Sequence, residues 1–225
     1  MKTIAVISQK GGSGKTTLAL NLAVAAHLDE KEAVIADLDE QASAVMWHHA
    51  REEPMPHVQA TEPASLPNLH AEAQRQGFDY FIIDTAPQSN DPAVMAAEMA
   101  DCILITCKLS VMDLRAVQNT LSLLNVANLK PGVRIYMILS MVEHFSKREG
   151  EEAAEVLKKL KMRVLPAWTG SRVAYRHSLI RGQGVLEYDP NGKAADEIRK
   201  IYEVVSKAAS KPSKVRSQQD NMMAS

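Results

Sequence analysis

The feature that most constrains this chain is a glycine-rich segment near its start: Lys10-Gly11-Gly12-Ser13-Gly14-Lys15-Thr16-Thr17. A short apolar run over 3–8 precedes the segment and predicts a buried strand, and an apolar stretch over 18–28 follows it and predicts a helix. Glycines allow the backbone to curl so that successive N–H groups point into one concavity, which binds anions. The helix that begins there adds the positive end of its dipole. The order of strand, glycine-rich turn and helix therefore predicts a phosphate-binding loop.

Two side chains of this loop have defined chemistry. The ammonium of Lys15 is expected to reach the β- and γ-phosphates of a nucleotide, and the hydroxyl of Thr16 is a ligand for magnesium. Gln9 stands where the general phosphate-loop pattern has its first glycine, and Lys10 adds a second lysine. The segment thus follows a variant pattern, Lys-Gly-Gly-x-Gly-Lys-Thr-Thr, known as the deviant Walker A motif. With this motif the chain resembles the ParA/MinD family of P-loop ATPases.

Apolar and amphipathic segments continue along the chain in the alternating order of an α/β protein. The segments predicted as strands are 32–38, 57–60, 79–84, 100–107, 133–140 and 162–166. The segments predicted as helices are 44–51, 66–76 (ending at Gly77), 111–126, 146–161 and 191–209. Together with the resemblance, this order predicts an α/β fold of the P-loop NTPase type, with a mostly parallel twisted sheet flanked by helices on both faces.

The length and composition of the chain predict one domain. At 225 residues, 46% of them hydrophobic, the chain is long enough to bury a substantial core but short for two domains. We predict a single P-loop ATPase domain over 1–209. The segment 210–225 is rich in Ser, Lys and Gln, and it is predicted to be a disordered basic tail. Such a tail is either simply solvated or a basic arm that contacts phosphates.

A second signal is an apolar strand that ends in an acid, within the run Asp79-Tyr80-Phe81-Ile82-Ile83-Asp84-Thr85-Ala86-Pro87. In a parallel sheet such a strand presents its final side chain at the edge where ligands bind. Asp84 is therefore predicted to hold magnesium, through a water, opposite Thr16. The ending Asp-Thr-Ala-Pro is also what the ParA/MinD family shows.

A pair of carboxylates, Asp37 and Asp39, stands at the C-terminal end of the strand predicted at 32–38. Alternation along the strand places Asp37 and Asp39 on the same side of the chain. The segment is similar to the family pattern Asp-x-Asp-Pro-Gln-x-Ser, with Glu40 in place of the proline. The resemblance implies that Asp39 orients the attacking water and that Asp37 lies near the magnesium ion. The alternative from the residues alone is a solvated loop in which an aspartate caps the next helix.

Three further segments can be placed only by resemblance. The segment 168–187 is similar to the family segment that follows the last core strand and lies beside adenine and the dimer seam, which makes Arg172 an expected nucleotide-binding residue. Ser140 stands where many relatives carry an asparagine for adenine. Ser110 and Asp113 match a family loop at the dimer interface, although its two prolines are missing here.

The family mechanism implied by the resemblance is an ATP-dependent homodimer with ATP and Mg²⁺ as cofactors. Lys10 is expected to cross the interface and contact the ATP of the partner subunit, so that Lys10, Lys15 and Asp39 form the catalytic set. The expected nucleotide-binding residues are Lys10, Gly11, Gly12, Ser13, Gly14, Lys15, Thr16, Thr17, Asp84 and Arg172. The expected metal-binding residues are Thr16, Asp37 and Asp84. Hydrolysis is expected to be slow until a partner protein completes the site.

The resemblance is greatest to small ParA-type plasmid partition ATPases that lack an N-terminal helix-turn-helix. It implies ATP-dependent binding to DNA without sequence preference, with hydrolysis stimulated by a ParB-like centromere-binding adaptor. The net charge of −1 requires that any attraction to DNA come from a local patch. The candidate DNA contacts are Arg176, Arg181, Lys193, Arg199, Lys200 and Lys207. The hypothesis is plasmid or chromosome partitioning by a cytoplasmic, nucleoid-associated protein.

Other functions of the superfamily remain open or are disfavoured. A ParA-like ATPase that positions another cargo, such as a conjugation complex or a protein organelle, fits the same motifs. A MinD-like membrane ATPase needs a bulky apolar face after Val205, which this chain lacks, and no apolar run approaches the ~20 residues of a membrane span. We therefore expect no integral membrane association. Because Met1-Lys2-Thr3 leads straight into the first predicted strand, we also expect no signal peptide. An iron–sulfur carrier needs paired cysteines near the C-terminus, where none follows Cys107, and Lys10 disfavours a metabolic P-loop ligase.

Overall fold

The computed structural model describes residues 1–87, 89–108, 111–143, 151–152, 155 and 163–210. The predicted helix over 146–161 falls almost wholly outside these ranges, and so does nearly all of the predicted tail over 210–225. Ser110 is also outside them, and the side chain of Asp113 is not described. The dimer-interface prediction for these two residues therefore stays a prediction.

A six-stranded parallel sheet forms the centre of the described chain. Its strands lie in the order β3-β2-β4-β1-β5-β6. Their bounds are β1 Lys2–Ile7, β2 Ala33–Asp37, β3 His57–Ala60, β4 Tyr80–Asp84, β5 Cys102–Cys107 and β6 Arg134–Leu139. The inner strands are continuous apolar runs because both faces of a parallel sheet are covered.

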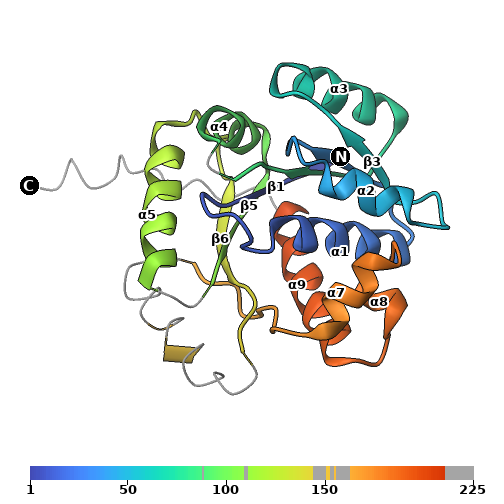
Figure 1. The fold of residues 1–225 in the computed structure, drawn as a ribbon. Helices are drawn as coiled ribbons and strands as arrows, with labels where there is room; N and C mark the ends of the chain where they lie inside the picture. The colour runs from blue at the N-terminus through green and yellow to red at the C-terminus, as the bar shows by residue number, and fades with distance from the viewer. Residues whose placement is uncertain (88, 109–110, 144–150, 153–154, 156–162, 211–225) are drawn as a thin grey trace, which may run out of the picture.

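Helices cover both faces of this sheet, as Figure 1 shows. One face packs against α1 (Lys15–Leu28), α8 (Val185–Tyr188) and α9 (Lys193–Ser210), with α7 (Val173–Ile180) beside them. The other packs against α3 (Leu66–Gln76), α4 (Asn90–Met99) and α5 (Val111–Val126). A short helix, α2 (Ser43–His49), follows β2 and contacts β3 and α1. The predicted fold class is confirmed.

Most of the predicted elements are present at or near their predicted bounds. The strand at 57–60 and the helix at 66–76 coincide with β3 and α3, and Gly77 ends α3 with a φ of 89°. The strand predicted at 162–166 is wrong in extent, because among its described residues only Val164 pairs, in an isolated bridge with Met137. The helix α4 has no counterpart in the sequence predictions, since its small apolar residues give no clear helical stripe.

The parallel topology brings the ends of several strands to one edge of the sheet. Asp37, at the end of β2, pairs in register with Asp84, at the end of β4, and Asp84 is also the register partner of Val6 on β1. The glycine-rich loop leaves the sheet at this same edge, directly after β1.

None of the helices in the described ranges combines the length and the apolar composition that a membrane span requires.

Candidate nucleotide-binding site

The glycine-rich loop is held in a fixed shape by its glycines and by the neighbouring strands. Gly12 and Gly14 have φ values of 64° and 88°, which residues with a Cβ atom rarely adopt. Gly14 directly precedes α1. The Ser13 hydroxyl lies 2.8 Å from the hydroxyl of Thr106 on β5. The Ser140 hydroxyl, just after β6, donates to the Ser13 carbonyl oxygen at 2.7 Å. The loop is thus anchored on the side away from β2 and β4.

Lys15 is the first residue of α1, and only 6% of it is exposed. Burial lowers the pKa of its ammonium, while the charges of Asp84 and Asp39 raise it. A buried ammonium between two carboxylates is suited to an anion that brings further negative charge and replaces the lost water. The position of Lys15 therefore matches the phosphate contact expected from the sequence.

Asp84 is the most unusual group of the site. It is fully buried, and neither of its carboxylate oxygens has a hydrogen-bond partner in the described part of the chain. Burial raises the pKa of this carboxyl to about 7, opposed by the Thr16 hydroxyl and by Lys15, although Thr16 makes no hydrogen bond of good geometry with it. An unpaired buried carboxylate beside a hydroxyl and a phosphate loop fits a divalent cation, because hard cations prefer oxygen ligands. The residues present thus fit Mg²⁺.

Asp37 lies beside Asp84 but is fully engaged with the backbone. One carboxylate oxygen accepts the Asp39 amide at 3.1 Å, and the other accepts the amides of Ala44 and Val45, at the start of α2, at 2.9 and 3.3 Å. Burial nevertheless raises the pKa of Asp37, opposed by these hydrogen bonds. This geometry matches the helix-capping alternative more closely than a metal ligand. The metal role of Asp37 stays a prediction without structural support.

Asp39 lies in the loop between β2 and α2, where it is half-buried. Its carboxylate accepts the Gln41 amide at 3.0 Å, so the loop folds back on it in a tight turn. Asp39 also lines the cavity that the phosphate loop faces. The structure therefore places Lys15, Thr16 and Asp39 around one cavity, and their roles there stay predictions.

Two adjoining cavities open over the phosphate loop. The first, about 610 Å³, is lined by the loop residues from Gly12 to Thr17, by Asp39 and by Trp47 of α2. The second, about 470 Å³, shares Gly14, Thr17, Met141, Leu179 and Ile180 with the first, and it is lined by mostly apolar groups together with Ser140 and Arg172. Two adjoining cavities, one of them formed by the phosphate loop itself, have room for the phosphates and the base of a nucleotide.

Arg172 borders the second cavity but its guanidinium is paired. It contacts the Glu197 carboxylate of α9 through Nε at 2.7 Å and through Nη2 at 2.6 Å. The same carboxylate accepts the Gly170 amide and the Tyr175 hydroxyl, each at 3.0 Å. Arg172 therefore shapes the wall of the cavity, and its direct contact with a nucleotide stays a prediction.

The candidate DNA contacts do not form one patch of unpaired charge. Arg199 pairs with Asp196 and Lys207 with Glu203, in each case on α9, and these acids reduce the local positive charge. Arg181 lies over the ring of Tyr188, 5.2 Å from its centre. The exposed residues Arg176, Lys193 and Lys200 complete the set. The Lys10 side chain is half-buried, and its amide donates to Ser8.

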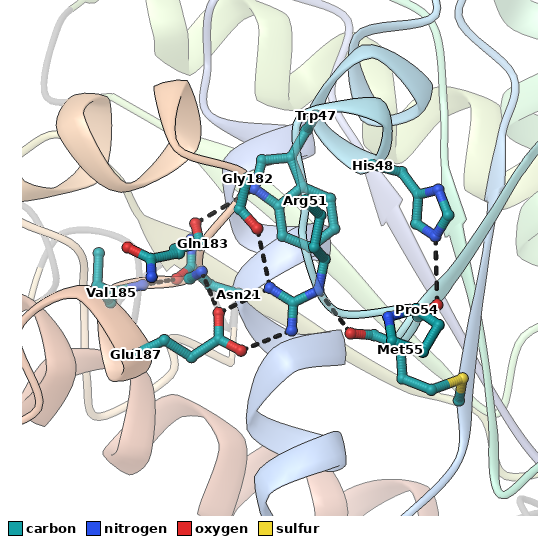
Figure 2. Close-up of polar contacts among 11 residues, drawn as sticks. Asn21, Trp47, His48, Arg51, Pro54, Met55, Gly182, Gln183, Val185 and Glu187 are labelled. Carbon is teal, nitrogen blue, oxygen red and sulfur yellow. Dashed lines mark hydrogen bonds and ion pairs between the residues drawn. The ribbon is translucent and has the colours of Figure 1, made fainter.

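A polar network around Arg51 has no counterpart in the sequence predictions (Figure 2). Its guanidinium forms a two-pronged ion pair with Glu187 of α8, at 2.6 and 2.9 Å, and only 2% of the Arg51 side chain is exposed. The two residues are 136 positions apart, and each looks like an ordinary surface charge in the sequence. Only the fold reveals the pair.

Comparison with known proteins finds relatives among nucleotide-binding proteins of one family. Residues 4–62 match the family model described as the CobQ/CobB/MinD/ParA nucleotide binding domain. A maintenance of carboxysome distribution protein A from Gloeobacter kilaueensis is 27% identical over 208 residues, covering 91% of this chain and 92% of the relative. The chromosome-partitioning ATPase Soj from Thermus thermophilus is 27% identical over 170 residues, covering 62% of this chain and 68% of Soj. The MinC:MinD cell division protein complex of Aquifex aeolicus has a similar fold, with a TM-score of 0.77 at 16% identity, covering 92% and 96%.

A parallel sheet with a phosphate loop after β1 and a buried acid at the end of β4 defines a P-loop nucleotide-binding protein. Within that class, residues 4–62 are of the CobQ/CobB/MinD/ParA nucleotide-binding type, and the fold of the chain is that of the ParA/MinD proteins. The family resemblance seen in the sequence is therefore confirmed.

Proposed function

We propose that this chain is a magnesium-dependent ATPase that dimerises with ATP and uses the dimer to position a cargo inside the cell. The observation that carries the proposal is the buried Asp84 carboxylate. It has no hydrogen-bond partner among the described residues, and it lies next to Thr16 and Lys15 of the phosphate loop. Thr16 and Asp84 would hold Mg²⁺ there, and the ion supplies charge neutralisation at the phosphate oxygens. Lys15 holds the phosphates, and Asp39 orients the attacking water.

Dimerisation is supported by apolar side chains at the mouth of the nucleotide cavity. Met46, Met141 and Ile180 line this cavity and are exposed by 68%, 40% and 71%. Large apolar groups gathered around a polar site are typical of a protein interface. Lys10, in the adjoining loop, would reach the ATP of the partner subunit.

Two kinds of cargo deserve a test. The relative from Gloeobacter kilaueensis, which aligns along nearly its whole length, favours a protein assembly, because its name assigns it to carboxysome distribution. The relative Soj favours partitioned DNA, through an adaptor of the ParB type. In both cases the ATP-bound dimer would bind nucleoid DNA, and the adaptor would choose the cargo.

The first experiment is ATP-dependent binding to non-specific duplex DNA, comparing the wild-type protein with Lys10→Ala and Lys15→Ala. We expect binding by the wild type only with ATP and Mg²⁺, and loss of binding in both variants. The affinity should fall steeply with salt, because phosphate contacts release counterions. Dimerisation by ATP without DNA binding would reject the DNA-based function, and binding to anionic liposomes in ATP would favour a membrane surface instead.

A further inference from the structure

The helix α2 links the Asp39 loop to a distant part of the chain. At its start, the Asp37 carboxylate accepts the amides of Ala44 and Val45 and also that of Asp39. Asp39 and the start of α2 are thus fixed by the same side chain. A displacement of α2 would therefore disturb Asp39 as well, because the Asp37 carboxylate binds both segments.

The other end of α2 is fixed by Arg51, which lies just beyond the helix. Figure 2 shows its guanidinium between the Gly182 carbonyl, the Met55 carbonyl and the Glu187 carboxylate. The Cζ atom of Arg51 also lies 5.1 Å from the centre of the Trp47 ring, and Trp47 lines the first of the two cavities. The guanidinium donates one hydrogen bond to Met55, one to Gly182 and two to Glu187, and these bonds hold the end of α2 in place.

The turn between α7 and α8 is shaped to receive Arg51. Gly182 has a φ of 65°, and a Cβ at this position would lie 2.5 Å from the backbone of Ala50 and Arg51. The two backbones therefore approach as closely as they do because residue 182 is glycine. The Trp47 indole donates to the Gln183 carbonyl at 3.2 Å, and the Gly184 amide donates to Glu187 at 2.8 Å.

The same turn is tied to the helix of the phosphate loop. The Val185 amide donates to Asn21 of α1 at 2.8 Å, and the Asn21 amide group donates to the Thr17 carbonyl, also at 2.8 Å. Thr17 is the last residue of the phosphate-loop motif. A continuous chain of polar contacts thus runs from Asp39 through α2, Arg51 and the α7–α8 turn to the phosphate loop.

We propose that Arg51 is a positioning residue for hydrolysis, which uses the Glu187 carboxylate to hold α2 and Asp39 in register with the phosphate loop. The inference rests on the proposed ATPase function and specifies how its site is kept in order. Arg51 lines neither of the two cavities over the phosphate loop. Its loss should therefore act on turnover more than on nucleotide binding.

The test compares Arg51→Lys, which keeps the charge but loses the two-pronged geometry, with Arg75→Met, a change of an exposed arginine on α3. We expect Arg51→Lys to lower kcat about tenfold with little change in KM, and Arg75→Met to leave both unchanged. In the nucleotide-free protein, hydrogen exchange at the amides of Asp39, Gln41 and Ala44 should be about tenfold faster in Arg51→Lys.

A double variant, Arg51→Met with Glu187→Met, removes the pair without leaving one charge buried, so it guards against a failure to fold. It should show the same loss of kcat and the same faster exchange. If exchange rises only near 47–55 and 181–187 while kcat is unchanged, Arg51 is a local structural contact and the inference is wrong. If the wild type hydrolyses no ATP, the proposed function fails, and the exchange at Asp39 still decides whether Arg51 positions that loop.

Discussion

Asp37 and Asp84 end neighbouring strands, in register and both buried, yet their surroundings are opposite. Asp37 accepts three backbone amides and organises the start of α2. Asp84 has no hydrogen-bond partner among the described residues, and burial raises its pKa to about 7. A carboxylate that stabilises the fold is satisfied by the fold itself, whereas one that serves a ligand is left unsatisfied until the ligand binds.

The largest expected effect comes from removing the unsatisfied carboxylate. Asp84→Asn keeps the shape of the side chain but removes the charge that would hold Mg²⁺, so ATPase activity should fall about 100-fold. The nucleotide-free protein should become more stable, because an amide is cheaper to bury than an unpaired carboxylate. Steady-state kinetics and thermal unfolding without Mg²⁺ measure the two effects.

The matched control for this variant is Asp91→Asn, which changes an exposed carboxylate at the start of α4. It should leave activity and stability unchanged. A loss of both activity and stability in Asp84→Asn would show that Asp84 is a structural residue like Asp37, and the contrast between the two carboxylates would be lost.

The second prediction concerns the satisfied carboxylate. Asp37→Ala leaves three amides without an acceptor, so the free energy of unfolding should fall by about 2–3 kcal/mol. Asp37→Asn retains an acceptor oxygen and should cost less. Chemical denaturation measures both values, and the Mg²⁺ affinity of the folded Asp37→Asn protein checks the metal role: a loss as large as that of Asp84→Asn would make Asp37 a metal ligand after all.

The sequence predicted the phosphate loop, Asp84 and Asp39 because each signal is local. A glycine-rich turn between a strand and a helix is typical of a phosphate-binding loop. An acid at the end of a buried strand lies at the edge of the parallel sheet where ligands bind. The different roles of Asp37 and Asp84 were not separable in this way. Their local patterns are alike, and only the approach of α2 to one of them decides which carboxylate is satisfied.

The Arg51–Glu187 pair and the engagement of Arg172 by Glu197 escaped prediction for a related reason. In each case the partner comes from a remote segment, and the sequence shows only ordinary charged residues. The Arg51 side chain is only 2% exposed because Gly182 lets the two backbones approach closely. The hydrophobic periodicity of the sequence gives no sign of this approach. Such contacts belong to tertiary packing rather than to local pattern.

A third prediction uses pH to separate the two carboxylates. In the unfolded chain Asp84 loses its proton near the ordinary value of 3.8, whereas in the folded protein burial raises the pKa to about 7. The folded state therefore binds more protons in this window, and stability falls as pH rises, by up to about 1.4 kcal/mol per pH unit. Unfolding curves between pH 4 and 7.5 without Mg²⁺ should show this fall in the wild type, and Asp84→Asn should reduce it.

Added Mg²⁺ should also reduce the fall, because the cation favours the ionised carboxylate. The Asp37→Asn protein should keep most of the fall in stability with rising pH, since Asp84 still titrates in that variant. The burial-raised pKa of Asp37 acts in the same direction, so a small part is expected to disappear. If Asp37→Asn abolishes the pH dependence of stability and Asp84→Asn does not, then Asp37 on β2, rather than Asp84 on β4, is the carboxylate that titrates.

The smallest expected effect extends the comparison to β6. The sequence resemblance implies that Ser140 stands where many relatives carry an asparagine for adenine. In the structure its hydroxyl donates to the Ser13 carbonyl and so supports the phosphate loop, as Asp37 supports α2. Ser140→Ala should lower the free energy of unfolding by about 1 kcal/mol. Ser122→Ala, which removes only a contact within an exposed turn of α5, is the control. If Ser140→Ala instead leaves stability unchanged and reduces the preference for ATP over GTP, Ser140 serves the ligand, and it belongs with Asp84 rather than with Asp37.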